Sequence, residues 1–327
     1  MNKKCIIVTT IHAPSDQLIH YSTLSDWTLI VVGDSKTTDS LYCNMKCVYL
    51  GLNDQKLLFP TLYTKIPLHS YTRKMFGYLY AIKHNFDIIY DTDDDNQYLG
   101  DLNGFNKDRP TKCCDDIGFT NIYKVFTNEN IWPRGIPPNH VCIPIQPHLT
   151  DKTENLQCAI IQGLVNNDPD VDAHYRLHTS DVPFTFEKDD GYDIMLNKYA
   201  VCPFNTQNTF WIDPAFFYTM YLPTTVTFRY TDILRGFVAL FQLWKHDKTI
   251  KITIPSAFQK RNAHDLHKDY EQEIPMYETA EKVIDILQKN VDASIIDVYT
   301  ILADHNIVTH SEIDVLQEWL RLAQRSQ

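Results

Sequence analysis

The sequence predicts an α/β fold in which a mostly parallel β-sheet is flanked by helices and followed by a helical C-terminal appendage. Three observations support this class. Short apolar runs alternate with helical patterns over the first hundred residues, acid-rich segments follow these runs directly, and the last fifty residues show only helical periodicity. At 327 residues, the chain can form one large or two smaller domains. We expect a catalytic domain at residues 1–275 and a helical extension at residues 276–327.

Four strands are expected in the first hundred residues, because short apolar and β-branched runs are bounded there by turn residues. One helix is expected before the fourth strand, where apolar side chains recur at helical spacing. The expected strands are residues 5–10, 27–32, 47–50 and 86–90, and the expected helix is residues 71–84.

The rest of the chain divides into a turn-rich middle and a helical end. Residues 226–230 read as a short strand. Residues 231–245 read as a helix that Thr231 or Asp232 could cap. Apolar stripes predict further helices at about 276–290, 295–305 and 311–325. This tail could pack on the domain, bind a partner or join two copies of the chain as a homodimer.

Charge and cysteine content restrict the class of protein. Acidic residues outnumber basic ones by 41 to 30, which argues against a nucleic-acid polymer as partner but allows one phosphorylated ligand held at a metal. No run approaches eighteen apolar residues, and the N-terminal apolar run is too short for a signal sequence. The eight cysteines form no CxxC pair. We therefore expect a soluble cytoplasmic protein without a membrane span.

An aspartate cluster, residues 91–95, follows the fourth expected strand and is the clearest functional signal. A strand that ends in alternating carboxylates supplies the hard oxygen ligands that Mg²⁺ and Mn²⁺ prefer. Asp93 and Asp95 are therefore candidate metal ligands, although a solvated turn stays open as an alternative. An EF-hand loop starting at Asp91 is excluded, because Asn96 and Leu102 replace the required Gly and Glu.

Basic and aromatic residues elsewhere supply candidate contacts to an anionic substrate. Arg73 and Lys74 could reach a diphosphate from the start of their helix, or lie in a solvated turn. Phosphate-binding P-loop and dinucleotide motifs are absent from the sequence. Trp132 and Arg134 lie in a stiff Trp-Pro-Arg-Gly segment, where the indole could stack on a sugar ring or simply fill a core turn.

Two later segments add carboxylates and a histidine. Asp170 and Asp172 alternate in a turn-rich segment, while Asp232 begins a helix whose dipole favours an ionised carboxylate. Such a group could take the proton of an acceptor hydroxyl, or merely cap the helix. His264 could complete a metal shell, or be an ordinary surface histidine.

Taken together and in this order, these segments resemble the STELLO family of plant Golgi proteins, described as glycosyltransferases of the GT-A fold. A more remote similarity links the chain to the plant reversibly glycosylated polypeptides, which are UDP-arabinose mutases and share the Asp-Asp-Asp and Pro-Asp-x-Asp-Ala segments. The STELLO resemblance covers about residues 5–275. It rests on residues 7–11, 31–37, 70–82, 89–96, 132–135, 162–177, 203–209 and 222–236.

The resemblance implies a Rossmann-like GT-A domain that transfers a sugar from a nucleotide-diphospho-sugar, UDP- or GDP-linked, to a glycan or other hydroxyl acceptor. It implies Mn²⁺ or Mg²⁺ as cofactor, held by Asp93, Asp95 and His264. Asp232, Asp172 and Arg134 are the implied catalytic residues. The implied substrate-binding residues are Thr9, Thr10, Ile11, Asp34, Lys36, Arg73, Lys74, Asp94, Trp132 and Asp170.

Two other functions remain open from the sequence. The chain could be a sugar-nucleotide mutase that is glycosylated on an arginine, for which Arg134 is the nearest candidate. It could also be a non-catalytic scaffold that uses the acidic edge or the helical tail to bind a partner. Because no membrane anchor accompanies the resemblance, a Golgi location does not carry over.

Overall fold

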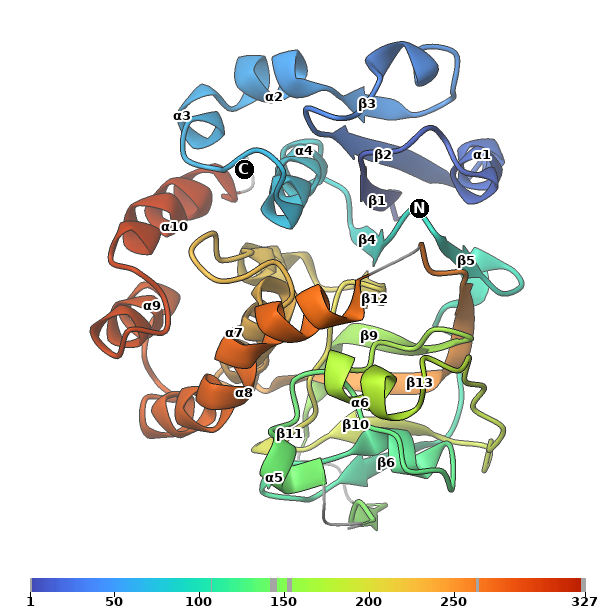
Figure 1. Cartoon of the computed structure of the whole chain (residues 1–327), viewed down its shortest axis with the longest axis vertical. Helices are drawn as coiled ribbons and strands as arrows, with labels where there is room; N and C mark the ends of the chain where they lie inside the picture. Colours follow the sequence, from blue (N-terminus) through green and yellow to red (C-terminus); the bar gives the residue numbers. More distant parts are fainter. Residues whose placement is uncertain (1, 107, 142–145, 152–154, 263–264, 325–327) are drawn as a thin grey trace.

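The computed structural model describes residues 2–106, 108–141, 146–151, 155–262 and 265–324. An eleven-stranded mixed sheet runs through the molecule in the order β3-β2-β1-β4-β12-β9-β13-β10-β6-β8, with β5 paired to β13 (Figure 1). Its strands are β1 Lys4–Thr10, β2 Trp27–Gly33, β3 Val48–Leu50, β4 Ile88–Thr92, β5 Asn96–Tyr98, β6 Thr111–Cys114, β8 Leu149–Thr150, β9 Gln157–Asn166, β10 Asp193–Leu196, β12 Asn208–Trp211 and β13 Lys248–Gln259. A separate pair joins β7 Gly118–Phe119 to β11 Ala200–Val201.

The parallel part of the sheet comes chiefly from the N-terminal third of the chain. β3, β2, β1 and β4 are parallel neighbours, with Ile7 opposite Ile30 on one side and Asp91 on the other. β9 and β13 are also parallel, and so are β6 and β10. β12 is antiparallel to both β4 and β9, so it joins the N-terminal strands to the rest. The predicted α/β class is confirmed, and the four strands expected from the sequence all form.

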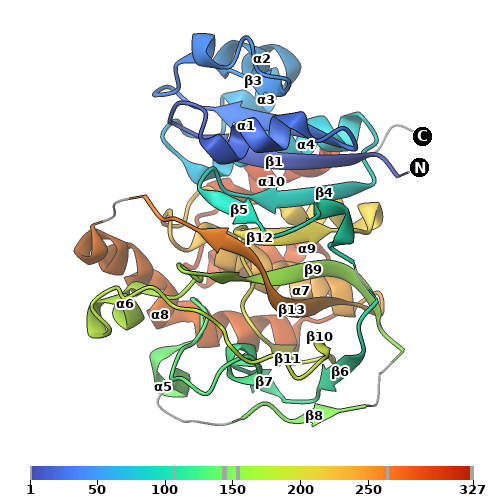
Figure 2. The same ribbon diagram turned by 90° about the vertical axis from the view of Figure 1, so that its right-hand side faces the viewer.

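Helices cover both faces of the sheet (Figure 2). The predicted helix at residues 71–84 starts as a 3₁₀ turn, Tyr71–Lys74, and continues as α4. The helices are α1 Asp16–Thr23, α2 Leu52–Leu58, α3 Pro60–Tyr63, α4 Met75–Lys83, α5 Pro138–Val141, α6 Ala173–His178, α7 Thr231–Trp244, α8 Leu266–Lys289, α9 Ile295–Asp304 and α10 Ser311–Leu322.

Side-chain alternation along β1 divides the core into two layers. Ile6 and Val8 pack with Leu18 and Tyr21 of α1, whereas Cys5 and Ile7 face the layer that contains α4, α7 and the C-terminal helices. α4 lies close against the strands at Gly77, where an added Cβ would stand 2.7 Å from a methyl carbon of Ile7. This close approach fixes the segment that leads from α4 into β4 and the aspartate cluster.

The C-terminal helices pack on the same core as the sheet. α8 begins at Leu266, before the start predicted near residue 276, and continues through Pro275. Met276, Tyr299 and Trp319 join the core cluster that also contains α4 and α7. The division of the chain at residue 275 therefore stays a prediction. Within the described ranges, no helix is long and apolar enough to cross a bilayer.

The prediction of a strand at residues 226–230 is wrong. The segment forms a turn, in which the backbone N–H of Tyr230 donates to the carbonyl of Thr227. Buried carboxylates of the C-terminal helices hold this loop in place of a strand partner. Glu312 accepts hydrogen bonds from the backbone N–H groups of Thr224 and Thr225, each at 2.8 Å.

Candidate active site

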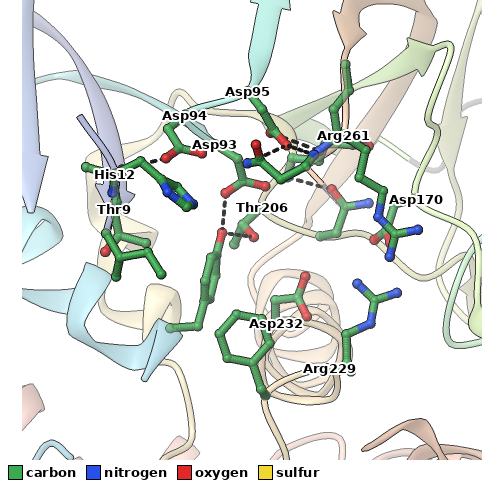
Figure 3. Close-up of a pocket in the computed structure, with 18 of the residues that line it drawn as sticks. Thr9, His12, Asp93, Asp94, Asp95, Asp170, Thr206, Arg229, Asp232 and Arg261 are labelled. Carbon is green, nitrogen blue, oxygen red and sulfur yellow. Dashed lines mark hydrogen bonds between the residues drawn. The ribbon is translucent and has the colours of Figure 1, made fainter. Parts of the chain in front are cut away.

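A cavity of about 520 Å³ opens where the parallel strands β1, β2 and β4 end. The carboxyl ends of strands are the usual place for ligands in open α/β sheets. Three loops that are distant in sequence therefore meet at this edge (Figure 3). The described residues that line the cavity are Thr9, Thr10, Ile11, His12, Asp34, Lys36, His69, Ser70, Tyr71, Asp93, Asp94, Asp95, Arg134, Asp170, Arg176, Asn205, Thr206, Gln207, Phe228, Arg229, Asp232, Gln259, Arg261 and Asn262.

The loops after β1 and β2 are tied to each other and to the loop before α4. The Thr37 hydroxyl donates to the carbonyl of Thr10 at 2.7 Å. The carboxylate of Asp34 accepts from the backbone N–H of Ser35 at 2.6 Å and from that of Ser70 at 3.3 Å. The sequence-predicted residues Thr9, Thr10, Ile11, Asp34 and Lys36 all line the cavity here.

Asp93, Asp94 and Asp95 form the acidic side of the cavity, on the loop between β4 and β5. Asp93 accepts a hydrogen bond from the Tyr71 hydroxyl at 2.7 Å, and Asp95 accepts one from the Gln259 amide at 2.9 Å. Burial raises the pKa of Asp95 to about 6, and the negative charges of Asp93 and Asp94 add to this rise. The pKa of Asp94 is also raised by burial. The acidic side thus has more negative charge than its neighbours neutralise.

This donor set fits a divalent cation. Carboxylate oxygens are the ligands that Mg²⁺ and Mn²⁺ prefer, and an added positive charge would relieve the repulsion within the cluster. Among the described residues, no group of three or more His, Cys, Asp or Glu side chains is placed to hold a metal ion. His264, the third ligand predicted from the sequence, lies outside the described residues.

A buried ionic network supports the acidic side from below. The Lys74 ammonium lies 2.7 Å from Asp91 and 3.3 Å from Asp93, and its side chain is fully buried. The Tyr78 hydroxyl donates to the other oxygen of Asp91 at 2.8 Å. A buried charge is costly unless an opposite charge and hydrogen bonds compensate it. Lys74 and Asp91 provide this for each other, so each side chain keeps the other in position.

The predicted diphosphate contacts of Arg73 and Lys74 are not supported by their positions, since neither residue lines the cavity. Arg73 is fully buried and donates to the side chain of Gln55 and the carbonyl of Ile66. Lys74 is occupied by Asp91. Both side chains therefore support loops behind the cavity surface instead of facing a ligand.

Arg134 uses all five of its N–H groups within the protein. The guanidinium makes bidentate hydrogen bonds to Asp170, at 2.7 and 2.9 Å, and to Asp232, at 2.9 and 2.8 Å. Its remaining N–H donates to the backbone carbonyl of Arg229. Gly135 allows this arrangement, because it adopts a φ of +107° and an added Cβ would lie 2.7 Å from Ile233.

The hydrogen bonds of Arg134 affect two predictions, that Arg134 could be glycosylated and that Asp232 could act as a base. An arginine that is to be glycosylated needs a free nitrogen, and Arg134 has none, so the geometry does not favour a mutase that uses this residue. Asp232 was predicted as a base or as a helix cap. Burial favours a raised pKa for Asp232, but the charge and hydrogen bonds of Arg134 outweigh burial and hold that pKa below its usual range.

The capping prediction for α7 is wrong. α7 has no side-chain cap, because the Thr231 hydroxyl donates to the carbonyl of Pro223 at 2.8 Å and Asp232 is bound to Arg134. Asp232 does lie in the first turn of α7 and faces the cavity (Figure 3). Its lowered pKa makes it a weak proton acceptor.

Trp132 and Asp172 lie together outside the cavity. The Trp132 indole N–H donates to Asp172 at 2.7 Å, and both side chains are buried. Asp172 also accepts from the backbone N–H of Tyr175 and so caps α6. The predicted sugar stacking by Trp132 and the predicted catalytic role of Asp172 are therefore not supported by their positions.

Three arginines that were not predicted as site residues also line the cavity. Arg176 lies on α6, Arg229 precedes α7 and Arg261 follows β13. With Arg134 they form the arginine side of the cavity. Arg176 lies on a helix of only six residues and the other two lie in loops, so no periodic pattern marks them. The position of Arg261, three residues before His264, is the one signal in the sequence.

Comparison with known proteins identifies relatives among plant proteins. Probable glycosyltransferase STELLO2 and Probable glycosyltransferase STELLO1 of Arabidopsis thaliana are 28% and 27% identical to this chain over 267 and 278 residues, or 74% and 78% of its length. The resemblance to the STELLO family is thereby confirmed. The chain spans only about a third of these relatives, 34% and 35% of their lengths. No family model matches.

A solved structure is also similar to this chain. It is glucosyl-3-phosphoglycerate synthase from Mycobacterium tuberculosis in complex with phosphoglyceric acid, with a TM-score of 0.42 and 9% sequence identity. The similarity covers 85% of this chain and 80% of that chain.

Proposed function

We propose that this chain is a glycosyltransferase that moves a sugar from a UDP- or GDP-linked donor to a hydroxyl group of an acceptor, with Mn²⁺ or Mg²⁺ as cofactor. One observation carries the proposal. The loops after β1 and β2 and the carboxylates after β4 line a single cavity at one sheet edge, which suits a nucleoside next to a metal-bound diphosphate. The names of the two plant relatives support the same class of activity.

The donor is assigned to the N-terminal side of the cavity. Thr9, Thr10, Ile11, Asp34 and Lys36 come from adjacent strand ends and would hold the nucleoside. Asp34 is fixed by two backbone N–H groups, so its carboxylate is preorganised to accept a hydroxyl or base N–H. Lys36 adds a positive charge near the position of the phosphates.

Asp93 and Asp95 would hold the cation, together with His264. When bound, the divalent ion supplies Lewis-acid stabilisation of the leaving diphosphate. The protein side chains have a separate task, which is to fix the two carboxylates. Tyr71 and Lys74 hold Asp93 from one side, while Gln259 holds Asp95 from the other. Asp94 is held by the Thr10 hydroxyl, which links the cation site to the nucleoside loop.

Acceptor binding is assigned to the region between Asp232, Phe228 and the arginine side. Asp170 and Asp232 are fixed by Arg134 and present an ordered surface toward the acceptor. The lowered pKa of Asp232 makes it suited to accept a hydrogen bond from an acceptor hydroxyl and orient it, more than to remove its proton.

The decisive experiment is a donor panel with a metal dependence. Purified protein is incubated with individual UDP- and GDP-sugars, with Mn²⁺, with Mg²⁺ or with EDTA, and free UDP or GDP is measured. We expect nucleotide release from at least one donor, and an unfolding temperature that rises with that nucleotide only when metal is present.

The Asp95→Asn variant should lose about a hundredfold or more in rate, because it removes a ligand whose cation stabilises developing charge in the transition state. Asp285→Asn is the matched control, since it makes the same chemical change at an exposed position of α8. No release from any donor, together with no nucleotide- or metal-dependent stabilisation, would contradict an enzymatic role and favour the scaffold.

A further inference from the structure

Three arginines of the arginine side border the acceptor region but have no individual role in the proposed function. Arg176, Arg229 and Arg261 come from three different elements and line the same cavity. Arg229 and Arg261 both extend toward the region beside Asp170, across the cavity from Thr9 and His12 (Figure 3). Three guanidinium groups in one enclosed region require an explanation, since like charges repel there.

Each arginine is anchored by at least one carboxylate, and Arg176 also donates to Asp168 at 3.1 Å and to the carbonyl of Pro169 at 2.9 Å. Arg229 donates to Glu273 of α8 at 2.9 Å, and Arg261 donates to Asp269 of the same helix at 2.6 Å. Arg176 donates to Asp181 at 2.8 Å. These carboxylates hold the guanidinium groups in fixed orientations, as residues that support ligand-binding side chains do.

The anchoring leaves buried N–H groups without partners. The Nε of Arg176 and the Nη1 of Arg261 are buried and form no hydrogen bond within the described structure. Nη1 of Arg261 lies 3.8 Å from Asp181, beyond hydrogen-bond distance. The two side chains are only 7% and 9% exposed, so bulk water does not easily satisfy these donors. A buried donor without a partner costs stability, and a bound water, ion or ligand would remove that cost.

The electrostatic state of Arg261 agrees with this geometry. Burial, followed by the positive charges of Arg176 and Arg229, lowers its pKa to about 10. The three guanidinium groups are thus close enough to affect one another, while the carboxylates of Asp269 and Asp181 act in the opposite direction. An oxyanion placed among the three groups would accept hydrogen bonds from the N–H groups that lack a partner.

We propose that Arg176, Arg229 and Arg261 form a subsite for an anionic group, a phosphate or a carboxylate, carried by the acceptor. The assignment to the acceptor rests on the proposed function, in which the donor diphosphate is bound at Asp93 and Asp95 beside the nucleoside loops. The guanidinium groups of Arg229 and Arg261 lie across the cavity from the nucleoside loop at Thr9 and His12 (Figure 3). The acceptor class is thus a hydroxyl compound that bears a negatively charged group near the hydroxyl that receives the sugar.

The first test uses the unmodified protein and inorganic phosphate as the probe. Titration calorimetry and thermal unfolding are measured with phosphate against chloride at equal ionic strength, and then repeated with saturating UDP or GDP and Mn²⁺. We expect phosphate to bind and to bind equally well beside the nucleotide. Absence of phosphate binding, or competition between phosphate and nucleotide, would overturn the assignment, since competition would place the anion site at the donor diphosphate.

Variants then locate the site. Arg261→Gln should weaken phosphate binding about tenfold or more, because it removes a charge-assisted hydrogen bond. Arg229→Lys keeps a positive charge for the buried Glu273 and should weaken phosphate binding severalfold in a folded protein. Arg321→Gln, on the exposed face of α10, is the matched control.

Unchanged phosphate affinity in both folded variants would refute the subsite. The proposed function is judged separately by nucleotide binding. If phosphate binds at these arginines but no nucleotide binds with metal, the donor assignment fails while the anion subsite stands.

Discussion

The acidic side of the cavity and Arg134 differ in how far their charges are paired within the protein. On the acidic side, three carboxylates lie close together with few positive neighbours, and the pKa of Asp95 is raised to about 6. Arg134, by contrast, donates every N–H it has to two carboxylates and one backbone carbonyl. Carboxylates without a positive partner suit the reversible binding of a cation. A guanidinium whose N–H groups are all bonded suits a structural role.

The degree of pairing distinguishes structural charged residues from those that can bind a ligand. Complete pairing marks Arg134, Lys74 and Asp91 as groups that hold loops in position. Incomplete pairing marks Asp95, Arg176 and Arg261 as groups that await a ligand. Two predictions concern buried charge at or near the arginine side, and a third concerns Phe228, which lies between the two sides.

The largest effect is expected from Arg134→Ala, which would break the paired side. It leaves Asp170 and Asp232 buried without their counterion, so we expect a loss of about 3–5 kcal/mol in the free energy of unfolding, measured by urea denaturation. Adding Asp170→Asn and Asp232→Asn to that variant should restore part of the loss. A loss within 1 kcal/mol would show that the guanidinium does not hold the two loops together.

A second prediction concerns Asp172, a carboxylate near the arginine side whose two hydrogen bonds come from the neutral N–H groups of Trp132 and Tyr175. Burial raises its pKa to about 6. A raised carboxyl pKa contributes stability that is fully present below the unfolded pKa, near 4, and is lost as pH rises through 6.

The Asp172→Asn variant, which resembles the protonated form, should therefore gain about 2–3 kcal/mol relative to the unmodified protein between pH 4 and pH 7.5. Urea denaturation at several pH values measures this difference. Asp285→Asn, exposed on α8, should show no such gain. If the difference between Asp172→Asn and the unmodified protein does not change with pH, Asp172 is charged throughout and the raised pKa is wrong.

The smallest effect on stability is expected from Phe228→Ala, between the two sides. The Phe228 ring is 50% exposed, lines the cavity and contacts Tyr71 edge-on at 5.5 Å between ring centres. Removing it should change the free energy of unfolding by only about 0.5 kcal/mol. We expect the KM for the acceptor to rise severalfold with kcat little changed, because an apolar contact to the bound acceptor is lost. A large fall in kcat at unchanged KM would assign the ring a different role.

Local patterns in the sequence were sufficient for the strands and the acidic side. β1, β2, β3 and β4 form apolar runs bounded by turns, and the carboxylates of Asp93 and Asp95 follow β4 directly. Such features depend on neighbours within a few residues, and parallel strand ends must share one edge. The positions of Thr9, Asp34 and Asp95 in one cavity therefore follow from the order of strands alone.

Which arginines face the cavity depends on the tertiary structure. The same sequence logic selected Arg73 and Lys74, which are buried behind the cavity, and passed over Arg176, Arg229 and Arg261, which line it. Whether a cation faces a ligand or a buried carboxylate depends on residues far away in the chain, such as Gln55 for Arg73 and Glu273 for Arg229. Sequence determined which charges the protein has and where its strands end, but only packing determined which of those charges are already neutralised.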